Sequence, residues 1–179
     1  MLNRRQFLVC GAAATASATL AASPAEAAIH TRVERSVALH NTHTGESLKT
    51  VYWSAGHYEP GALRQINRIL RDHYSGTIHQ MDPRMIDLLF ALQHRLGTKK
   101  PFEIVSGYRS PATNAMLAAM SDGVAQHSLH MEGKAVDIRL EGLSVRHLGR
   151  AARALRMGGV GQYPDSNFVH VDVGHVRYW

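Results

Sequence analysis

The sequence predicts a single α+β domain in which helices flank a small antiparallel sheet. Hydrophobic residues make up 45% and charged residues 19% of the 179 residues, a balance typical of a globular protein. Helical and β-prone segments are mixed without a regular βαβ rhythm, which argues against a doubly wound parallel sheet. No internal repeat or low-complexity linker follows residue 28. One compact domain therefore accounts for residues 28–179.

A β-hairpin and a helix are expected at the start of this domain. The β-prone runs 33–41 and 46–53 are separated by the turn-like residues 41–45. Pro60 can open a helix that has apolar residues at helical spacing. These residues are Leu63, Ile66 and Leu70.

The next helix has clear boundaries. Asp82 can cap its first turn, Pro83 fits the first helical position, and Gly97 ends it. Its apolar face is formed by Met85, Leu88, Leu89, Leu92 and Leu96. A stripe of this kind is typical of a core-facing helix.

Shorter elements come next. Residues 102–106 are β-prone, and residues 112–121 have helical character after the loop 107–111. Residues 122–131 are expected to be irregular and 134–140 to form a strand.

The chain is expected to end with one helix and further strands. Ser144 can cap a helix that runs through Met157 and ends at Gly158-Gly159. Its inward residues are Val145, Leu148, Ala152 and Leu155. The final strands are expected at 161–163, 168–173 and 176–179.

The N-terminus has the pattern of an export signal. Arg4 and Arg5 precede Phe7-Leu8 and an alanine-rich, weakly hydrophobic stretch, and Ala25-Glu26-Ala27 gives a small-x-small cleavage pattern. The arrangement resembles a twin-arginine signal, so residues 1–27 are expected to direct the chain to the periplasm and then to be removed. The alternative is a basic, alanine-rich tail.

Charge and cysteine content limit the function classes. Lys and Arg number 20 against 14 Asp and Glu, and the formal charge of +6 favours an anionic partner, which by charge alone is a cell-wall polymer, a lipid headgroup or a nucleic acid. The basic residues are dispersed and match no nucleic-acid-binding motif, so nucleic acid is not an expected partner. The one cysteine, Cys10, lies in the expected signal, which excludes a disulfide or thiol catalysis in the mature chain. No apolar run after the signal is long enough for a membrane span, and nothing indicates the oligomeric state.

Three segments, 106–110, 128–137 and 168–173, concentrate residues that carry chemistry, and the last two contain the histidines and carboxylates. His130 is on a loop, and Asp137 follows it in a β-prone run after Gly133, which allows the backbone to turn. In the strand 168–173, His170 and Asp172 project from one face. If the strands of Asp137 and His170 are neighbours, the two histidines and Asp137 can converge as a catalytic zinc set with a fourth position for water.

The motifs resemble a known family. The pattern Ser-x-His-x-x-Gly-x-Ala-x-Asp at 128–137, followed by a late histidine in an aromatic-apolar strand, resembles the M15 group of zinc peptidases. The group includes D-Ala-D-Ala carboxypeptidases, phage endolysins and murein endopeptidases, and it shares its metal-site fold with the Hedgehog signalling domain. The twin arginines, Ser-Gly-Tyr-Arg-Ser at 106–110 and Phe-Val-His-Val-Asp at 168–172 are most similar to the exported branch typified by murein endopeptidase K. The resemblance implies a Hedgehog/D-Ala-D-Ala-peptidase-like fold for nearly the whole of 28–179.

The resemblance also implies site roles. His130, Asp137 and His170 become the ligands of one zinc ion per chain. Arg109 becomes the residue that clamps the substrate and stabilises the developing oxyanion; the alternative is that it pins its own loop. Ser128 hydrogen-bonds either the substrate or the ligand loop.

The proton acceptor is less clear from the resemblance. Several relatives place Glu or Asp three residues before the last zinc histidine, where this chain has Asn167, and others place a histidine where it has Phe168. Asp172 is the favoured acceptor because it shares the face of His170, and Asp165 is the next candidate. The alternative for Asp172 is a carboxylate that orients a histidine.

The predicted function is that of an exported zinc metallopeptidase acting on stem peptides or cross-links of peptidoglycan. The resemblance favours an endopeptidase over a carboxypeptidase and leaves the cleaved bond open. Two other functions are kept: a non-catalytic peptidoglycan-binding module that retains zinc, supported by Asn167, and a periplasmic structural protein without metal.

Overall fold

The computed structural model describes residues 34–121 and 123–179. These residues belong to one compact unit, which spans Arg32–Trp179. The expected signal peptide, residues 1–27, lies outside the described residues, as do Val33 at the start of the first predicted strand and Asp122.

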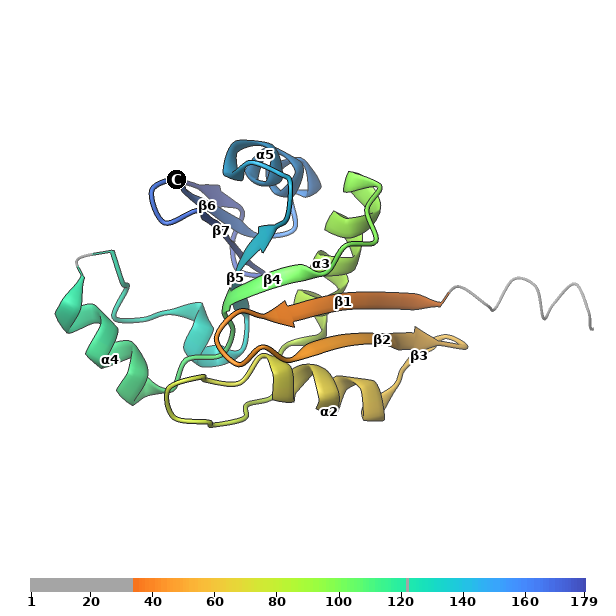
Figure 1. The fold of residues 1–179 in the computed structure, drawn as a ribbon, viewed down its shortest axis with the longest axis horizontal. Coiled ribbons are helices and arrows are strands. Elements are labelled where there is room, and N and C mark those ends of the chain that lie inside the picture. Colours follow the sequence, from red (N-terminus) through yellow and green to blue (C-terminus); the bar gives the residue numbers. More distant parts are fainter. Residues whose placement is uncertain (1–33, 122) are drawn as a thin grey trace, which may run out of the picture. The chain divides into compact units, whose positions relative to one another are not determined.

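The described part of the chain contains four α-helices, one short 3-10 helix and eight strands, a mixed α+β composition as predicted (Figure 1). The helices are α2 (Pro60–Ile69), α3 (Pro83–Leu96), α4 (Pro111–Met120), α5 (Val145–Leu155) and the 3-10 helix η1 (Leu129–Glu132). The strands are β1 (Arg35–Asn41), β2 (Ser47–Ser54), β3 (His57–Tyr58), β4 (Phe102–Ser106), β5 (Ala135–Leu140), β6 (Gly159–Tyr163), β7 (Phe168–Asp172) and β8 (Arg177–Tyr178).

All eight strands belong to one sheet in the order β3-β2-β1-β4-β5-β7-β6-β8. Five of the pairings are antiparallel, as predicted, but β1–β4 and β6–β8 are parallel, so the sheet is mixed and larger than the small antiparallel sheet expected. A parallel pair needs a long crossover connection, and the segment between β2 and β4, which contains α2 and α3, provides it for β1–β4.

The helix caps agree with the local sequence. The Asp82 side chain accepts a hydrogen bond from the Arg84 backbone N–H at 2.9 Å, and Gly97 ends α3 in the left-handed conformation with a φ of 62°. Helix α5 begins after Ser144 as predicted but ends at Leu155, because Arg156 adopts a left-handed φ of 54°. The residues after it, starting at Gly159, then join the sheet as β6.

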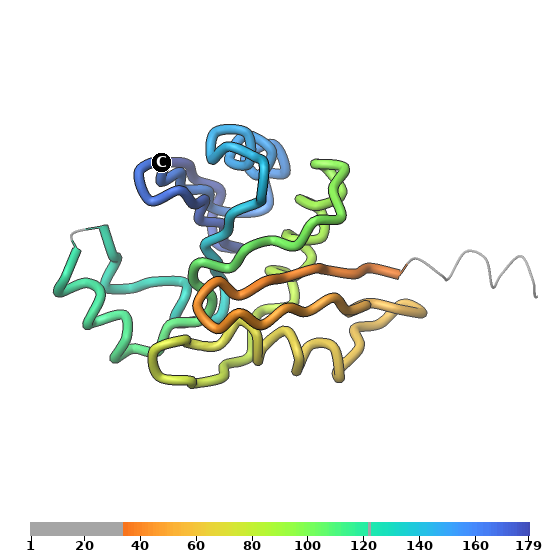
Figure 2. The backbone as a smooth tube through the Cα atoms, viewed as in Figure 1, coloured from red at the N-terminus to blue at the C-terminus, as the bar shows by residue number. Residues whose placement is uncertain are grey.

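One hydrophobic core lies against the sheet. Helix α2 packs along β1 and β2, α5 packs on β5, β6 and β7, and α3 contacts both β1 and α5 (Figure 1). The chain between β4 and β5 leaves the sheet through α4 and returns through η1 (Figure 2). This excursion carries the segment 128–133 to the sheet face opposite the core. Within the described residues, no helix is both long and apolar enough to cross a bilayer.

Candidate metal centre

Two neighbouring strands bring the predicted strand ligands to one row of the sheet. Asp137 on β5 pairs directly with His170 on β7, and Gly161 on β6 is the next residue in the row. Val136 and Val169 are buried in the core. Because side chains alternate along a strand, Asp137 and His170 therefore project from the other face of the sheet.

The 3-10 helix η1 delivers the third predicted ligand, His130, above this row. Ser128 caps η1, and Gly133 ends it with a φ of 65°, the turn expected from the sequence. A side chain at this position would also lie 2.6 Å from the carbonyl oxygen of Gln80, so only glycine fits the turn. The His130 side chain on η1 is fully buried.

The three side chains converge. The Nε2 atom of His130 is 3.2 Å from Nδ1 of His170 and 3.3 Å from Oδ1 of Asp137. The Nδ1 atom of His170 is 2.9 Å from the same carboxylate oxygen. Ligand atoms bound about 2.0–2.1 Å from a tetrahedral zinc ion lie about 3.3 Å from one another. The observed spacing of the three donors therefore fits a zinc ion with one coordination position left open.

Each histidine is also held by a group on its outer nitrogen. The Nδ1–H of His130 donates to the carbonyl oxygen of Gly107 at 2.7 Å, which leaves the lone pair of Nε2 facing the centre. The Nε2 atom of His170 is 3.0 Å from Oδ2 of Asp172, which leaves Nδ1 for the centre. An oxygen acceptor behind each imidazole is the usual arrangement around metal-bound histidines.

The electrostatic environment favours a cation here. Burial lowers the pKa of His130, which favours the neutral imidazole that a metal requires. Burial would also lower the pKa of His170, but the hydrogen bonds and charges of Asp137 and Asp172 outweigh it and raise this pKa to about 9. The carboxylates thus stabilise positive charge at this position, whether it is a proton or a metal ion.

Asp172 lies behind His170 and is fully buried. Arg177 pairs with it in a two-pronged contact, at 3.1 Å to Oδ1 and 2.8 Å to Oδ2. The backbone N–H groups of Gly159 and Gly174 donate to Oδ1 at 3.1 and 2.8 Å. Together with Nε2 of His170 on Oδ2, these donors occupy both oxygens of the carboxylate.

The hydrogen bonds to Asp172 bear on its predicted role as the proton acceptor. Burial would raise the pKa of Asp172, but hydrogen bonds from His170, Arg177, Gly174 and Gly159 outweigh it and hold the pKa below its usual value. A carboxylate whose pKa is depressed in this way is a weak base. The placement instead favours the alternative, a carboxylate that orients His170.

The other two residues at issue for this role lie in the turn between β6 and β7. Asn167 adopts a left-handed φ of 53°, a conformation that Asn tolerates better than most residues, and its N–H donates to the Pro164 carbonyl at 3.1 Å. Asp165 is exposed in the same turn and forms no ion pair among the described residues.

Arg109 enters the site from the loop after β4. Its Nη2 atom donates to the Ser128 hydroxyl at 3.2 Å, and its backbone N–H donates to the His130 carbonyl at 3.2 Å. Its buried Nε atom has no partner among the described residues, and no carboxylate pairs with the guanidinium there. Burial lowers the pKa of Arg109, although the group stays charged. Ser128 thus contacts both Arg109 and the ligand loop.

Gly107 explains part of the Ser-Gly-Tyr-Arg-Ser pattern. A Cβ atom at this position would lie 2.3 Å from the carbonyl oxygen of Leu70, so no other residue fits. The close approach lets Tyr108 donate its N–H to that carbonyl at 2.7 Å. It also fixes the Gly107 carbonyl that accepts from His130.

An aromatic side chain borders the centre on the β6 side. The Trp179 ring lies 5.4 Å from the His170 ring, and its Nε1–H donates to the Tyr163 hydroxyl at 2.8 Å. The ring occupies the space above Gly161, where a Cβ atom would come within 2.5 Å of it.

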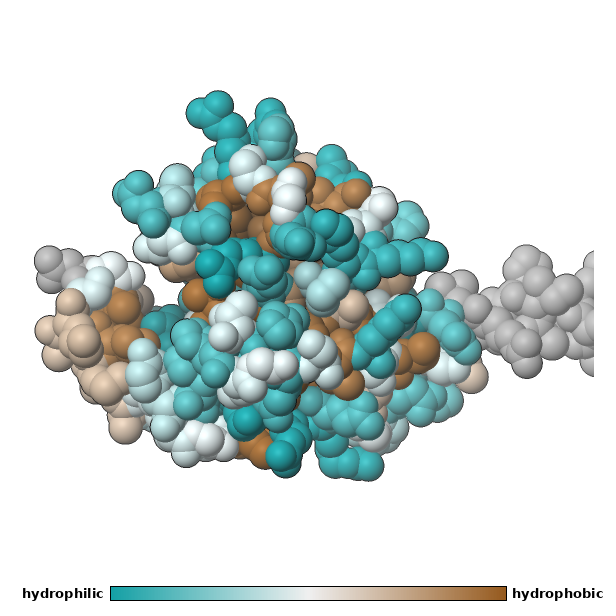
Figure 3. Space-filling model, in the orientation of Figure 1, coloured by the Kyte–Doolittle hydropathy of each residue, from teal (hydrophilic) through white to brown (hydrophobic). Residues whose placement is uncertain are grey.

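The space-filling view shows an indentation between α4 and the C-terminal strands, on the side where η1, β5 and β7 meet (Figures 1 and 3).

Sequence reasoning missed two contributors to this centre. Arg177 comes five residues after Asp172, and this spacing in a turn does not predict that the two side chains meet. The chain returns to the sheet as β8, and this return brings them together. Gly107 contributes a backbone carbonyl, and the residue types in the sequence do not indicate such a group. For Trp179 the sequence is compatible with a groove residue or with packing at the domain edge, and the residue lies beside His170.

Nearly the whole chain is similar to known proteins. The family model Peptidase_M15_2, described as peptidoglycan L,D-endopeptidase MepK, matches residues 29–179. The peptidoglycan L,D-endopeptidase MepK of Escherichia coli strain K12 is 43% identical over 177 residues, which cover 99% of this chain and 97% of that protein. The probable peptidoglycan L,D-endopeptidase MepK of Haemophilus influenzae is 38% identical over 178 residues, covering 99% and 95%. These matches confirm the resemblance to the murein endopeptidase K branch, and the chain belongs to the M15 peptidase family that the MepK model describes.

Proposed function

We propose that this chain is an exported zinc endopeptidase that hydrolyses L,D-linked peptide cross-links of peptidoglycan. The observation that carries the proposal is the convergence of His130, Asp137 and His170 with donor spacings of 2.9–3.3 Å. It is supported by 43% identity over nearly the full chain to a protein named peptidoglycan L,D-endopeptidase. The proposal includes a Hedgehog/D-Ala-D-Ala-peptidase-like fold, one zinc ion per chain, and delivery to the periplasm by the twin-arginine route.

In this proposal His130, Asp137 and His170 hold the zinc ion. When bound, zinc polarises a peptide carbonyl and lowers the pKa of water at the site. Gly107 and Asp172 fix the ring orientation of the two histidines, so that Nε2 of one and Nδ1 of the other face the same point. Arg177 in turn holds Asp172 ionised and in place.

Arg109 binds and orients the substrate. Its guanidinium is partly desolvated and forms no ion pair with a carboxylate among the described residues, so a substrate carboxylate or carbonyl can become its partner. Charge that develops on the scissile carbonyl oxygen is stabilised more strongly by such a donor than by water. Ser128 keeps the guanidinium at the edge of the centre.

Asp165 is the carboxylate that remains as proton acceptor. Its side chain is exposed in the β6–β7 turn, two residues before the position at which several relatives carry their acid. Asp172 acts instead as a positioning residue for His170, because both of its oxygens already accept hydrogen bonds.

A digest of defined muropeptides tests the proposal. The purified chain lacking residues 1–27, loaded with zinc, is incubated with an L,D-cross-linked dimer and separately with a D,D-cross-linked dimer, and the products are identified by mass spectrometry. We expect monomers from the L,D-linked dimer only. A chelator should abolish the cleavage and added zinc should restore it.

A non-catalytic, zinc-containing binding module is the second candidate. It is favoured by Asn167, which stands where several relatives have a carboxylate. Stoichiometric zinc and measurable binding of the dimers without any new product would select this candidate and reject the endopeptidase.

A further inference from the structure

A basic hollow lies at the edge of the sheet, next to the candidate metal centre. It has a volume of about 510 Å³ and is lined by Arg146, Arg150, Arg153, Gln162 and Trp179. Within the described part of the chain, no aspartate or glutamate side chain lines it. A concave surface with three guanidinium groups is suited to an anionic ligand.

The three arginines share one face of α5. Arg146 and Arg150 are four residues apart and Arg150 and Arg153 are three apart, so they are neighbours on the helix surface. The sequence of α5 contains no acidic residue. Like charges at this spacing disfavour a helix by a few tenths of a kcal/mol per pair. A bound anion would remove this repulsion.

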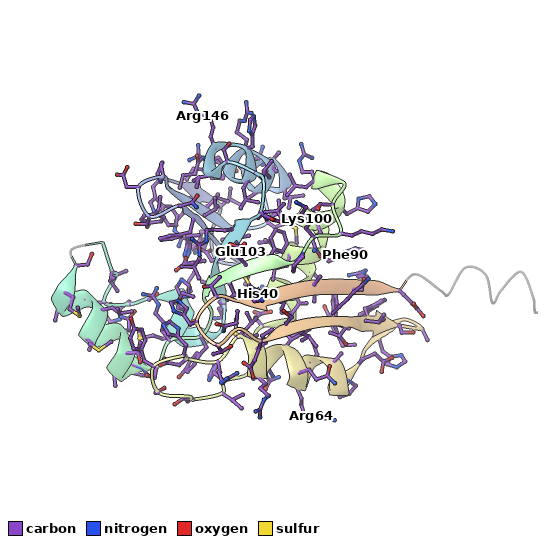
Figure 4. All side chains as sticks on the ribbon, in the orientation of Figure 1. His40, Arg64, Phe90, Lys100, Glu103 and Arg146 are labelled. Atoms are coloured by element: carbon purple, nitrogen blue, oxygen red, sulfur yellow. The ribbon has the colours of Figure 1, made fainter. Side chains whose placement is uncertain are left out.

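Aspartate and glutamate side chains among the described residues do not neutralise the arginines of the hollow. None of the three forms an ion pair with a carboxylate side chain there. Arg146 and Arg150 are exposed, and Arg146 extends away from α5 in Figure 4. Arg153 is held in place, since its Nη2 donates to the Trp179 carbonyl at 3.2 Å and its guanidinium lies 5.3 Å from the Tyr178 ring centre.

Trp179 connects the hollow with the metal centre. It lines the hollow, and its ring lies beside that of His170. The ring is fixed by Tyr163 and by the cation of Arg177, 5.0 Å from the ring centre, yet the residue remains 46% exposed. A ligand bound at the metal centre can therefore pass along Trp179 and reach the arginines.

We propose that this hollow binds a free carboxylate of a peptidoglycan stem peptide while the scissile bond lies at the metal centre. The inference rests on the proposed function, which supplies the substrate class. Stem peptides carry free carboxylates on their D-glutamate and diaminopimelate residues, within a few bonds of a cross-link. A guanidinium binds a carboxylate through two parallel hydrogen bonds, and rim charges of this kind govern capture of the ligand more than the chemical step.

The double variant R146Q/R150Q tests the proposal, with R64Q/R95Q as the matched control. Both pairs remove two positive charges from helix positions without an ion pair among the described residues. Arg64 lies at the opposite end of the view from Arg146 (Figure 4). For an L,D-linked dimer we expect R146Q/R150Q to raise KM about three- to tenfold with little change in kcat, and the control to behave as wild type. With a dimer whose carboxylates are amidated, wild type and R146Q/R150Q should have the same KM.

Several results would overturn the inference. These are an unchanged KM in R146Q/R150Q, an equal rise in the control, and an equal rise with the amidated dimer. If R146Q/R150Q loses binding to phosphatidylglycerol vesicles but keeps wild-type affinity for the dimer, the hollow binds a lipid surface instead.

A titration with an uncleaved monomeric tetrapeptide muropeptide separates this inference from the proposed function. Carboxylate-dependent binding that R146Q/R150Q weakens supports the hollow even if wild type cleaves no dimer, and in that case only the endopeptidase proposal fails. Binding that R146Q/R150Q leaves at the wild-type level rejects the hollow.

Discussion

At the scale of single residues, the two histidines of the centre are distinguished by which ring nitrogen faces inward. His130 presents Nε2 because Nδ1 donates to a backbone carbonyl, and His170 presents Nδ1 because Nε2 faces Asp172. The choice is made by the acceptor behind each ring and not by the ring itself. Replacing a ring therefore tests whether it is a ligand, and replacing its acceptor tests whether that group orients the ligand.

Replacing His130 by alanine removes one of the three protein donors. We expect the H130A variant to lose stoichiometric zinc, because two donors are insufficient for a stable zinc site. Elemental analysis after purification without chelator measures this, and H94A, at an exposed position on α3, is the matched control. Wild-type zinc content in H130A would show that the ligand assignment is incorrect.

Replacing Asp172 by asparagine distinguishes a positioning residue from a proton acceptor. The variant keeps the shape of the side chain but loses the charge that pairs with Arg177 and holds His170. We expect zinc affinity to fall about 10- to 100-fold, the usual effect of losing the group behind a metal-bound histidine. Competition with a chromophoric chelator measures the affinity.

The matched variant D165N supplies the other half of this test. Asp165 is exposed, so the variant should keep wild-type zinc affinity and lose most cleavage if Asp165 accepts the proton. If D172N keeps its zinc affinity and loses cleavage while D165N cleaves normally, the roles of the two carboxylates are reversed.

At the scale of elements, one buried carboxylate ties the Arg109 loop to the chain after α2. Asp72 accepts hydrogen bonds from the Ser110 N–H at 2.9 Å, the Thr113 hydroxyl at 2.6 Å and the Tyr74 N–H at 2.9 Å. Ser110 is the N-cap of α4, so Asp72 fixes both the start of α4 and the end of the Ser-Gly-Tyr-Arg-Ser segment. Burial would raise the pKa of Asp72, but these hydrogen bonds hold it below its usual value.

The variant D72N should therefore lower the free energy of unfolding, by about 1–3 kcal/mol at neutral pH. Because the pKa of Asp72 is lower in the folded than in the unfolded state, its contribution is present above the unfolded value of about 3.9 and is lost as the pH falls below it. The difference in stability between wild type and D72N should shrink between about pH 5 and pH 2. Urea unfolding of both proteins across this range measures it, and a difference that stays constant or grows in acid would contradict the role of Asp72.

At the scale of the whole molecule, the candidate centre depends on elements from the second half of the chain. The segment from β4 to β8 supplies Arg109, all three proposed ligands and the Asp172–Arg177 pair, whereas β1 to β3 and α2 form the other edge of the sheet. The twin-arginine route exports proteins that are already folded. If the chain follows the proposed twin-arginine route, we expect the centre to be complete before export.

Replacement of Arg4 and Arg5 by lysine tests the predicted route. The twin-arginine pair is the feature by which this route would recognise the precursor, so the double-lysine variant should accumulate in the cytoplasm. Fractionation followed by immunoblotting measures its location, and an R64K/R95K variant of the same precursor is the control. Unchanged delivery of the double-lysine variant to the periplasm would indicate the general secretory route.

Features that depend on local interactions could be predicted from the sequence. Asp82 and Ser144 each accept a backbone N–H at the first turn of the helix that they were predicted to cap, and Gly97 and Gly133 take the left-handed conformation where a turn was predicted. Strand alternation placed His170 and Asp172 on one face. These features are readable because a cap or a turn involves residues only a few positions apart.

Tertiary contacts alone set which of these local elements became neighbours. The parallel β1–β4 and β6–β8 pairs join strands that are distant in sequence or separated by another strand, and no local pattern specifies them. The same holds for Asp172. The sequence shows a carboxylate beside a histidine, but its partners Gly159 and Arg177 arrive through β6 and β8. Whether a carboxylate acts as a base or as a support depends on the groups that occupy its oxygens, and those groups are brought by the fold.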